Sequence, residues 1–205
     1  MPLSLGETKG CCYVAYDGLS GERYRFPGGQ TWTVVRHWIT RVTGFKAALI
    51  EPEGRSGITV LAFAGTDSLI DVAVDIVQAT GGMPPQYPQA VLLAADRMRS
   101  SGSALNLAGH SLGGGLAAYC STIFRTPAST VNPAPLIGAA TFSALLARNS
   151  QITNYVAQGG EIVSSSPGRN PGRNVYVPST GGTFGFVSDH LLANVAPSVP
   201  LPVKI

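Results

Sequence analysis

The sequence predicts an α/β fold with a mostly parallel central sheet flanked by helices. The apolar run GITVLAFAG, residues 57–65, ends in glycine and is typical of a strand covered on both faces. A second apolar run, over 103–109, leads directly into a small-residue helical segment over 112–124. Helical segments over 68–78 and 86–100 lie between the two runs. Strands that alternate with helices in this way imply βαβ units.

The remaining segments extend the same pattern. In the helix over 86–100, Ala90, Leu93, Ala94 and Met98 fall on one side. No internal repeat or low-complexity linker marks a boundary, so we expect one domain over residues 1–205. The other expected elements are a helix over 8–17 capped by Thr8, strands over 31–42 and 45–50 with a hairpin-like break at Thr43-Gly44, a short strand over 129–135, a helix over 142–148, strands over 152–158 and 174–179, and a last helical turn over 190–195.

The chain carries an unusually small share of charge. Charged residues make up 12% of the 205 residues, against about 25% in an average soluble protein. This composition suits work at an apolar interface and equally suits a soluble protein of low charge. The formal net charge of +3 is small and the basic residues are scattered. The sequence therefore argues against a nucleic-acid partner.

The cysteines and the first residues bear on the compartment of synthesis. Cys11, Cys12 and Cys120 form no disulfide framework, and we expect free, buried thiols. Such thiols indicate synthesis in a reducing compartment. The start, MPLSLGETKGCC, lacks the features of a secretory signal, and no apolar run has the length of a membrane span. We expect cytoplasmic synthesis, with the later location open.

The stretch GHSLG, residues 109–113, is the strongest chemical signal. It has the G-x-S-x-G pattern, in which small residues flank a sharp strand-to-helix turn and expose the serine hydroxyl. The alternative is that these glycines serve only close packing. A phosphate-binding loop is disfavoured because no Lys-Ser/Thr pair follows them. The strand before the turn and the helix after it favour Ser111 as a nucleophile.

A serine nucleophile needs a base, and few candidates follow it. In hydrolases of this kind the chain order is serine, acid, histidine. His190 is the one histidine after Ser111, so it is the candidate base. We interpret His37, which lies in an expected strand, as structural. His110 adjoins the nucleophile, and we expect its side chain to point away from the neighbouring hydroxyl.

Two carboxylates follow Ser111, and both remain candidates for the acid. Asp189 adjoins His190, and consecutive side chains seldom face each other. Glu161 follows an expected strand at the sheet edge and is preferred. The donors that stabilise the oxyanion are expected to be the backbone N–H of Leu112 and one from FAGTDS, residues 63–68.

Several of these stretches together resemble the class 3 lipases, the fungal triacylglycerol lipases and their bacterial relatives. The similarity rests on FAGTDS, the amphipathic segment behind it, YPQAVLLAADRM and LAGHSLGGGLA, in the family's order and approximate spacing. It extends from about residue 44 to residue 192. The resemblance implies an α/β-hydrolase fold with Ser111 as the nucleophile and His190 as the base.

The resemblance further implies that Glu161 is the acid and that Thr66 and Leu112 form the oxyanion hole. Three departures accompany it. Ala64 stands where the family usually has arginine, and the acid is usually aspartate. The strand after the elbow helix ends in NPAP rather than in a Gly-Ser-Pro-like turn.

The segment DSLIDVAVDIV, residues 67–77, occupies the family's lid position. Its aspartates fall on one stripe of a helix and its apolar residues on another. Such a lid would cover the closed site and turn toward lipid when open. The alternative is a surface helix docked on the core. The aspartates are Asp67, Asp71 and Asp75, and the apolar lid residues are Leu69, Ile70, Val72, Ala73 and Ile76.

Together these features predict hydrolysis of carboxylic esters through an acyl-serine intermediate. No metal ion or organic cofactor is expected, because no cluster has ligand spacing. The resemblance implies a lipid substrate at a membrane or micelle surface, a phospholipid or a glyceride. A small soluble ester is the alternative substrate, and an inactive hydrolase fold used for binding is the alternative class.

Small bacterial relatives of this kind resemble lipase toxins that a signal-independent system, such as type VI secretion, delivers into rival cells. On that reading the partner would be an immunity protein. The sequence carries no signal for an oligomeric state.

Overall fold

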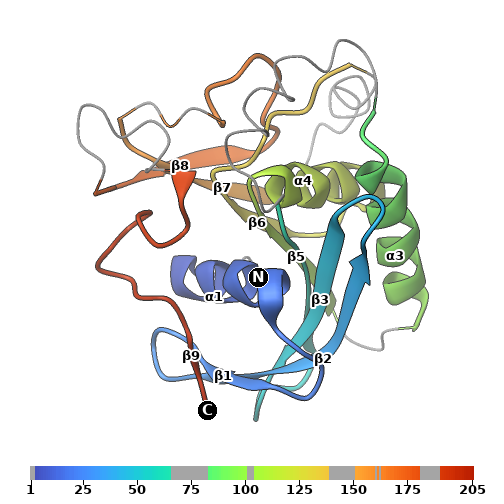
Figure 1. Ribbon diagram of the computed structural model, residues 1–205, viewed down its shortest axis with the longest axis vertical. Coiled ribbons are helices and arrows are strands. Elements are labelled where there is room, and N and C mark those ends of the chain that lie inside the picture. The colour runs from blue at the N-terminus through green and yellow to red at the C-terminus, as the bar shows by residue number, and fades with distance from the viewer. Residues whose placement is uncertain are drawn as a thin grey trace.

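A nine-stranded mixed sheet crosses the molecule in the order β8-β7-β6-β5-β4-β3-β2-β1-β9 (Figure 1). The computed structural model describes residues 3–65, 83–100, 104–138, 151–159, 161, 163–180 and 190–205. The strands are β1 (Arg23–Arg25), β2 (Thr31–Thr40), β3 (Phe45–Pro52), β4 (Ile58–Phe63), β5 (Ala104–His110), β6 (Ala128–Val131), β7 (Ile152–Ala157), β8 (Arg173–Val177) and β9 (Val203–Lys204).

Strands β4 to β8 form the parallel half of the sheet. Their register places Phe63 beside Gly109, Gly109 beside Thr130, and Thr130 beside Asn154. The carboxyl ends of these strands therefore lie along one edge. In open α/β sheets, ligands bind at that edge.

The other half of the sheet is antiparallel. Strands β1, β2, β3 and β9 pair antiparallel with their neighbours, and β3 also pairs antiparallel with β4. The connections over 41–44 and 53–57 are too short for a parallel crossover, which needs a dozen or more residues. The expected α/β architecture is confirmed, but the sheet is mixed and not mostly parallel.

Different helices cover the two faces of the sheet. Helix α1 (Leu5–Asp17) packs on the face that carries Val60 and Ala62 of β4. Helices α3 (Gln86–Ser100) and α4 (Leu112–Phe124) pack on the face that carries Leu61 and Phe63 (Figure 1). Alternate residues of β4 thus face opposite layers, and this explains why its apolar run is unbroken.

Helix α1 begins earlier than the sequence reading predicted. Its cap is Ser4, not Thr8: the Ser4 hydroxyl accepts from the Glu7 N–H, and the Glu7 carboxylate accepts from the Ser4 N–H. This capping box satisfies two backbone donors at the helix start. The helix extends over Leu5–Asp17 in place of 8–17, and Val14 is buried as expected.

The helices predicted over 86–100 and 112–124 are confirmed residue for residue. Ala90 and Ala94 face the core, whereas Met98 is 38% exposed because the last turn of α3 extends beyond the packed surface. The predicted strands correspond to β2 to β8, with ends that differ by one or two residues. The larger difference is that β6 ends at Val131 rather than at 135, because Asn132 adopts φ 42° ahead of Pro133. The short strands β1 and β9, at one end of the strand order, were not predicted.

Some expected elements lie outside the described residues. These are the helices over 68–78 and 142–148. In the expected last helical turn, a backbone bond joins the Asn194 N–H to the Leu191 carbonyl at 2.9 Å. Cys11, Cys12 and Cys120 are free and buried, as predicted. Within the described ranges, no helix is both long enough and apolar enough to cross a membrane.

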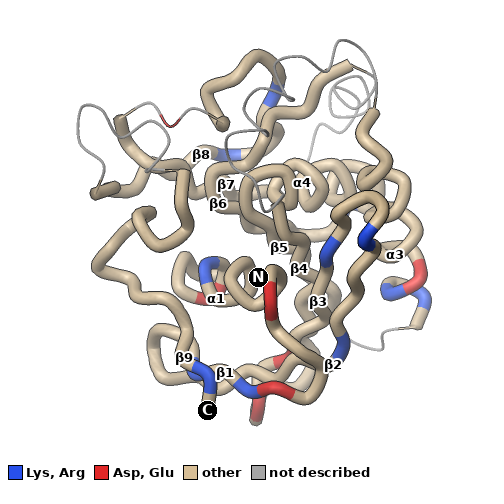
Figure 2. The backbone as a smooth tube through the Cα atoms, viewed as in Figure 1, with Lys and Arg blue, Asp and Glu red and all other residues tan. Residues whose placement is uncertain are grey.

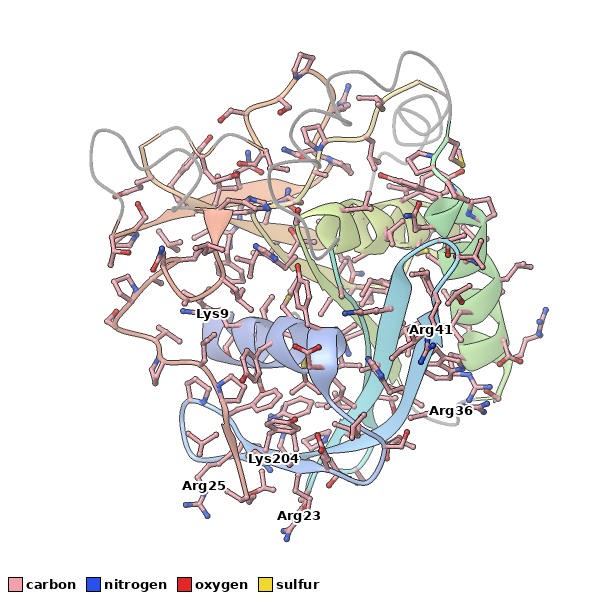
Figure 3. All side chains as sticks on the ribbon, in the orientation of Figure 1. Lys9, Arg23, Arg25, Arg36, Arg41 and Lys204 are labelled. Atoms are coloured by element: carbon pink, nitrogen blue, oxygen red, sulfur yellow. The ribbon has the colours of Figure 1, made fainter. Side chains whose placement is uncertain are left out.

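Lys9 joins α1 to the C-terminal segment. Its side chain is fully buried, and its ammonium donates to the carbonyl oxygens of Val195 and Val199 at 2.5 and 2.6 Å, and to that of Ala196 at 3.3 Å (Figure 3). Burial lowers the pKa of Lys9 to about 8. The three carbonyl partners offset the cost of burying this charge. The N-terminal helix is thereby fastened to the chain that follows His190.

Other charged residues of the described part lie around β1, β2 and β9 and on α3, with further ones on α1, β3 and β8 (Figure 2). Arg23 pairs with Glu53 at 2.6 Å, and Lys204 pairs with Glu22. These pairs are largely exposed, and each contributes little to stability. Arg23 and Lys204 lie on β1 and β9, at the bottom of the view (Figure 3).

Candidate active site

Ser111 stands on a strained turn between β5 and α4. Its backbone has φ 59° and ψ −129°, a conformation that costs a non-glycine residue about 1–3 kcal/mol. Backbone hydrogen bonds hold the turn: the Ser111 N–H donates to Val131 at 3.2 Å, and its carbonyl accepts from Gly115 at 3.2 Å and Ala134 at 2.9 Å. These bonds tie the turn to β6 and to the loop that follows it.

The glycines on either side of Ser111 are required by close backbone approach. A Cβ on Gly109 would overlap the carbonyl oxygen of Gly113. A Cβ on Gly113 would overlap the carbonyl oxygen of Phe63, at the end of β4. The G-x-S-x-G pattern therefore lets the chain turn sharply and lets α4 begin directly against the sheet.

The structure brings His190 and Glu161 together. His190 Nδ1 lies 2.5 Å from Glu161 Oε1, and both side chains are almost fully buried. Because an ionised carboxylate can only accept, Nδ1 carries the proton. The neutral imidazole then has its lone pair on Nε2, which is the tautomer that a general base needs.

Backbone and side-chain donors also hold the Glu161 carboxylate. Oε1 accepts from the Val163 N–H at 2.7 Å, and Oε2 accepts from the Ser164 N–H at 2.8 Å and hydroxyl at 2.6 Å. Burial would raise the pKa of Glu161, but the hydrogen bonds from His190 and Ser164 outweigh it and hold that pKa below 4.5. Glu161 is therefore ionised at neutral pH.

Two buried atoms beside this pair have no hydrogen-bond partner among the described residues. They are Ser111 Oγ and His190 Nε2. Buried polar atoms are nearly always paired, so unpaired ones need a reason. These two atoms are the ones that the sequence predicts to be the nucleophile and the lone pair of the base.

Two further residues, which the sequence reading did not select, hold the main chain of His190. His110 Nε2 lies 2.7 Å from the His190 carbonyl oxygen, and the two imidazole rings are in contact, tilted by 31° with centroids 4.8 Å apart. Asn132 Nδ2 donates to the same oxygen at 3.4 Å, while Asn132 Oδ1 accepts from the Ala157 N–H at 2.9 Å. The sequence signal that could have singled out Asn132 is the NPAP turn, which begins at this residue and departs from the family's pattern.

Of the other residues that the sequence analysis named, some lie within the described part of the structure and some lie outside it. Leu112 is the first residue of α4, where backbone N–H groups have no intrahelical partner. His37 lies on β2, and its Nε2 donates to the Ala15 carbonyl at 3.0 Å, as a structural residue would. Outside the described residues lie Thr66, Asp189 and the whole lid set: Leu69, Ile70, Val72, Ala73 and Ile76.

Within the part of the chain that the structure describes, no group of three or more His, Cys, Asp or Glu is arranged to hold a metal ion. The site is built from a serine, a histidine, a glutamate and backbone amides.

Comparison with solved structures assigns the architecture. A triacylglycerol lipase from Penicillium expansum superposes with a TM-score of 0.60 at 16% identity, covering 86% of this chain and 79% of the other. A triacylglycerol lipase in which a serine protease triad forms the catalytic centre gives 0.58 at 14% identity, covering 84% and 77%. The fold is that of the α/β-hydrolases.

Sequence comparison narrows the class to a family. Residues 29–166 match the phospholipase-like family model described as a Tle-like phospholipase domain, and the chain belongs to this family. An extracellular phospholipase A1 from Serratia liquefaciens is 44% identical over 92 residues. That match covers 45% of this chain and 28% of the relative, so the chain spans under a third of that protein's length.

Proposed function

We propose that the protein hydrolyses carboxylic esters of lipids through an acyl-serine intermediate. Ser111 is the nucleophile, His190 the general base and Glu161 the acid that orients it. The observation that carries the proposal is the buried His190–Glu161 pair, whose histidine contacts His110, the residue directly before Ser111. Ser111 Oγ and His190 Nε2 are both buried and have no partner among the described residues, so both remain available for a proton transfer during the reaction.

In the first half-reaction, His190 Nε2 takes the proton of the Ser111 hydroxyl as Oγ attacks the ester carbonyl carbon. The imidazolium that forms is stabilised by Glu161, which stays ionised. His190 then gives this proton to the leaving alcohol, and the acyl group remains on Ser111. In the second half-reaction, water attacks the acyl carbon, gives its proton to His190, and releases the acid as the proton returns to Ser111.

The oxyanion of each tetrahedral intermediate needs backbone donors. The N–H of Leu112, at the start of α4, is one proposed donor, because the helix dipole also favours negative charge there. Thr66 is the proposed second donor. It directly follows Gly65 in the sequence, and Gly65 is the second residue after β4.

The proposed substrates are phospholipids and glycerides. The family is described as phospholipase-like, and the Serratia relative is named a phospholipase A1. The structural neighbours named above are triacylglycerol lipases. These names favour a lipid substrate over a small soluble ester.

The test is ester hydrolysis by the wild type and by Ser111→Ala. A p-nitrophenyl ester series of rising chain length reports the chemistry, and phospholipid vesicles compared with a triglyceride emulsion report the substrate class. We expect Ser111→Ala to lose at least about 10³-fold in kcat. Equal rates for the two proteins would overturn the mechanism, and equal inactivity would favour the inactive binding fold.

We further propose that the protein acts outside the cell that makes it, and that a producing cell carries an immunity protein. The name of the Serratia relative supports export. Directing the wild type and Ser111→Ala to the periplasm or the cytoplasm of a bacterial host tests this. Growth arrest by the periplasmic wild type alone is expected, and arrest by neither form in either compartment would oppose a toxin role.

A further inference from the structure

Tyr16, near the end of α1, contacts two parts of the active site. Its hydroxyl lies 2.8 Å from His110 Nδ1 and accepts from the Gly65 N–H at 3.1 Å. Gly65 follows β4 and directly precedes Thr66, the proposed oxyanion donor. A Cβ on Gly65 would lie 2.9 Å from Ser111 Cβ and 2.7 Å from the Tyr16 hydroxyl, so these groups are in close contact.

The direction of each hydrogen bond follows from its partners. The His190 carbonyl can only accept, so His110 Nε2 carries the proton in their 2.7 Å bond. Burial and the neighbouring His190 lower the pKa of His110 to about 3, so the ring is neutral and Nδ1 must accept. The Tyr16 hydroxyl therefore donates to Nδ1. A directed chain runs from the Gly65 N–H through Tyr16 and His110 to the His190 carbonyl.

This chain of hydrogen bonds joins two loops whose relative position must stay fixed during catalysis. One carries Gly65 and the expected oxyanion donor, and the other carries the base. The His190 side chain is held by Glu161 at Nδ1, but its main chain is held by His110 and Asn132. The ring of His110 also contacts the ring of His190, with centroids 4.8 Å apart and an angle of 31° between the ring planes.

We propose that Tyr16 and His110 are positioning residues that hold the base loop and the oxyanion loop at a fixed separation for acyl transfer. By donating to His110 Nδ1, the Tyr16 hydroxyl fixes the tautomer in which His110 Nε2 carries the proton. This Nε2–H then donates to the His190 carbonyl oxygen. Because effective proximity falls steeply with displacements of about 1 Å, the loss of this link reduces kcat. This inference rests on the proposed hydrolase mechanism.

The link also gives α1 a role in the site. Tyr16 precedes residues 29–166, which match the family model, and it lies 94 residues from His110 in sequence. Lys9 holds the same helix to the carbonyls of the segment that follows His190. Helix α1 thus contacts both the end of β5, directly before Ser111, and the segment that follows His190.

The first test is Tyr16→Phe, with Tyr13→Phe as the matched control. Tyr13 lies on the same helix, is 41% exposed, and makes only an edge contact with Tyr24 among the interactions described. We expect kcat per active site, counted by covalent phosphonate labelling, to fall about 10–100-fold in Tyr16→Phe. KM for a soluble ester should stay within about twofold, and Tyr13→Phe should match the wild type.

The second test asks whether His110 acts through its hydrogen-bond donor or only through the volume that its side chain fills. His110→Gln keeps an N–H donor that can reach the His190 carbonyl, whereas His110→Leu has similar size and no donor. We expect the Gln variant to retain at least about tenfold more kcat than the Leu variant. His37→Leu is the control, since His37 also donates to a backbone carbonyl but at Ala15.

Proton NMR gives a readout that does not depend on turnover. The Nδ1–H proton of His190, hydrogen-bonded to Glu161, should shift or broaden in Tyr16→Phe and stay unchanged in Tyr13→Phe. Unchanged kcat per labelled site in Tyr16→Phe, with an unchanged resonance, overturns the proposal, as do equal kcat values for the two His110 variants. If the wild type hydrolyses no ester, the proposed function fails while the resonance still decides the positioning role.

Discussion

Replacing Glu161 with glutamine tests the acid of the proposed triad. The carboxylate accepts four hydrogen bonds, from His190, from Val163 and twice from Ser164. A glutamine amide has one acceptor oxygen and one donor nitrogen. If the oxygen keeps His190 and Val163, the new NH₂ faces the Ser164 N–H, and one buried donor is left unpaired.

The expected magnitude follows from this geometry. An unpaired buried N–H costs about 1–3 kcal/mol of stability. Removing the negative charge also removes its attraction for the His190 imidazolium, which is worth about 4 kcal/mol at 4 Å with an effective dielectric constant of about 20. That energy corresponds to about 10³-fold in kcat. We therefore expect Glu161→Gln to fold with reduced stability and to lose about 10²–10⁴-fold in kcat.

The assay is hydrolysis of a p-nitrophenyl ester per labelled active site, with urea unfolding of the same sample. Glu22→Gln is the matched control, because Glu22 also accepts from a backbone N–H and a hydroxyl, those of Leu19 and Tyr24, but lies on the far edge of the sheet. A loss in kcat of less than about tenfold in folded Glu161→Gln would refute the reasoning. A large loss in Asp189→Asn alone would move the acid to Asp189.

Three further outcomes are expected. The ionised Glu161 carboxylate contributes stability that is fully present above pH 4.5, its ordinary pKa, and is lost as the pH falls through its lower folded pKa. The difference in unfolding free energy between the wild type and Glu161→Gln should therefore shrink in acid. A difference that stays constant with pH contradicts this. Gly113→Ala should lower stability by about 1–3 kcal/mol because its Cβ meets the Phe63 carbonyl, and an unchanged Tm would oppose that packing. Lys9→Met should cost about 2–4 kcal/mol in urea unfolding, since carbonyls of the 195–199 segment lose their donor, and a neutral result would contradict the clamp.

Local patterns were sufficient for the elements that carry the nucleophile. The helices over 86–100 and 112–124 were predictable to the residue, because periodicity and glycine placement act within one or two turns. The start of α1 could also have been predicted, because Ser4 and Glu7 have the spacing of a capping box. The sequence analysis placed the cap at Thr8 instead. The antiparallel pairing of β2, β3 and β4 was accessible, because their short connections exclude a parallel crossover. The pairing of β1 with the edge strand β9 was not accessible, because it joins the two ends of the chain.

The sequence by itself determined the candidates: one serine on a glycine-flanked turn, one histidine after it, and two carboxylates. It favoured Glu161 over Asp189 but could not fix that choice, because Glu161 and His190 are 29 residues apart and their contact depends on the tertiary structure. The tertiary structure placed Glu161 at His190 Nδ1. It also revealed Tyr16, His110 and Asn132, whose shared task is to hold the backbone at the site. Main-chain amides and carbonyls are identical in every residue, so no sequence pattern records which of them a side chain will bind.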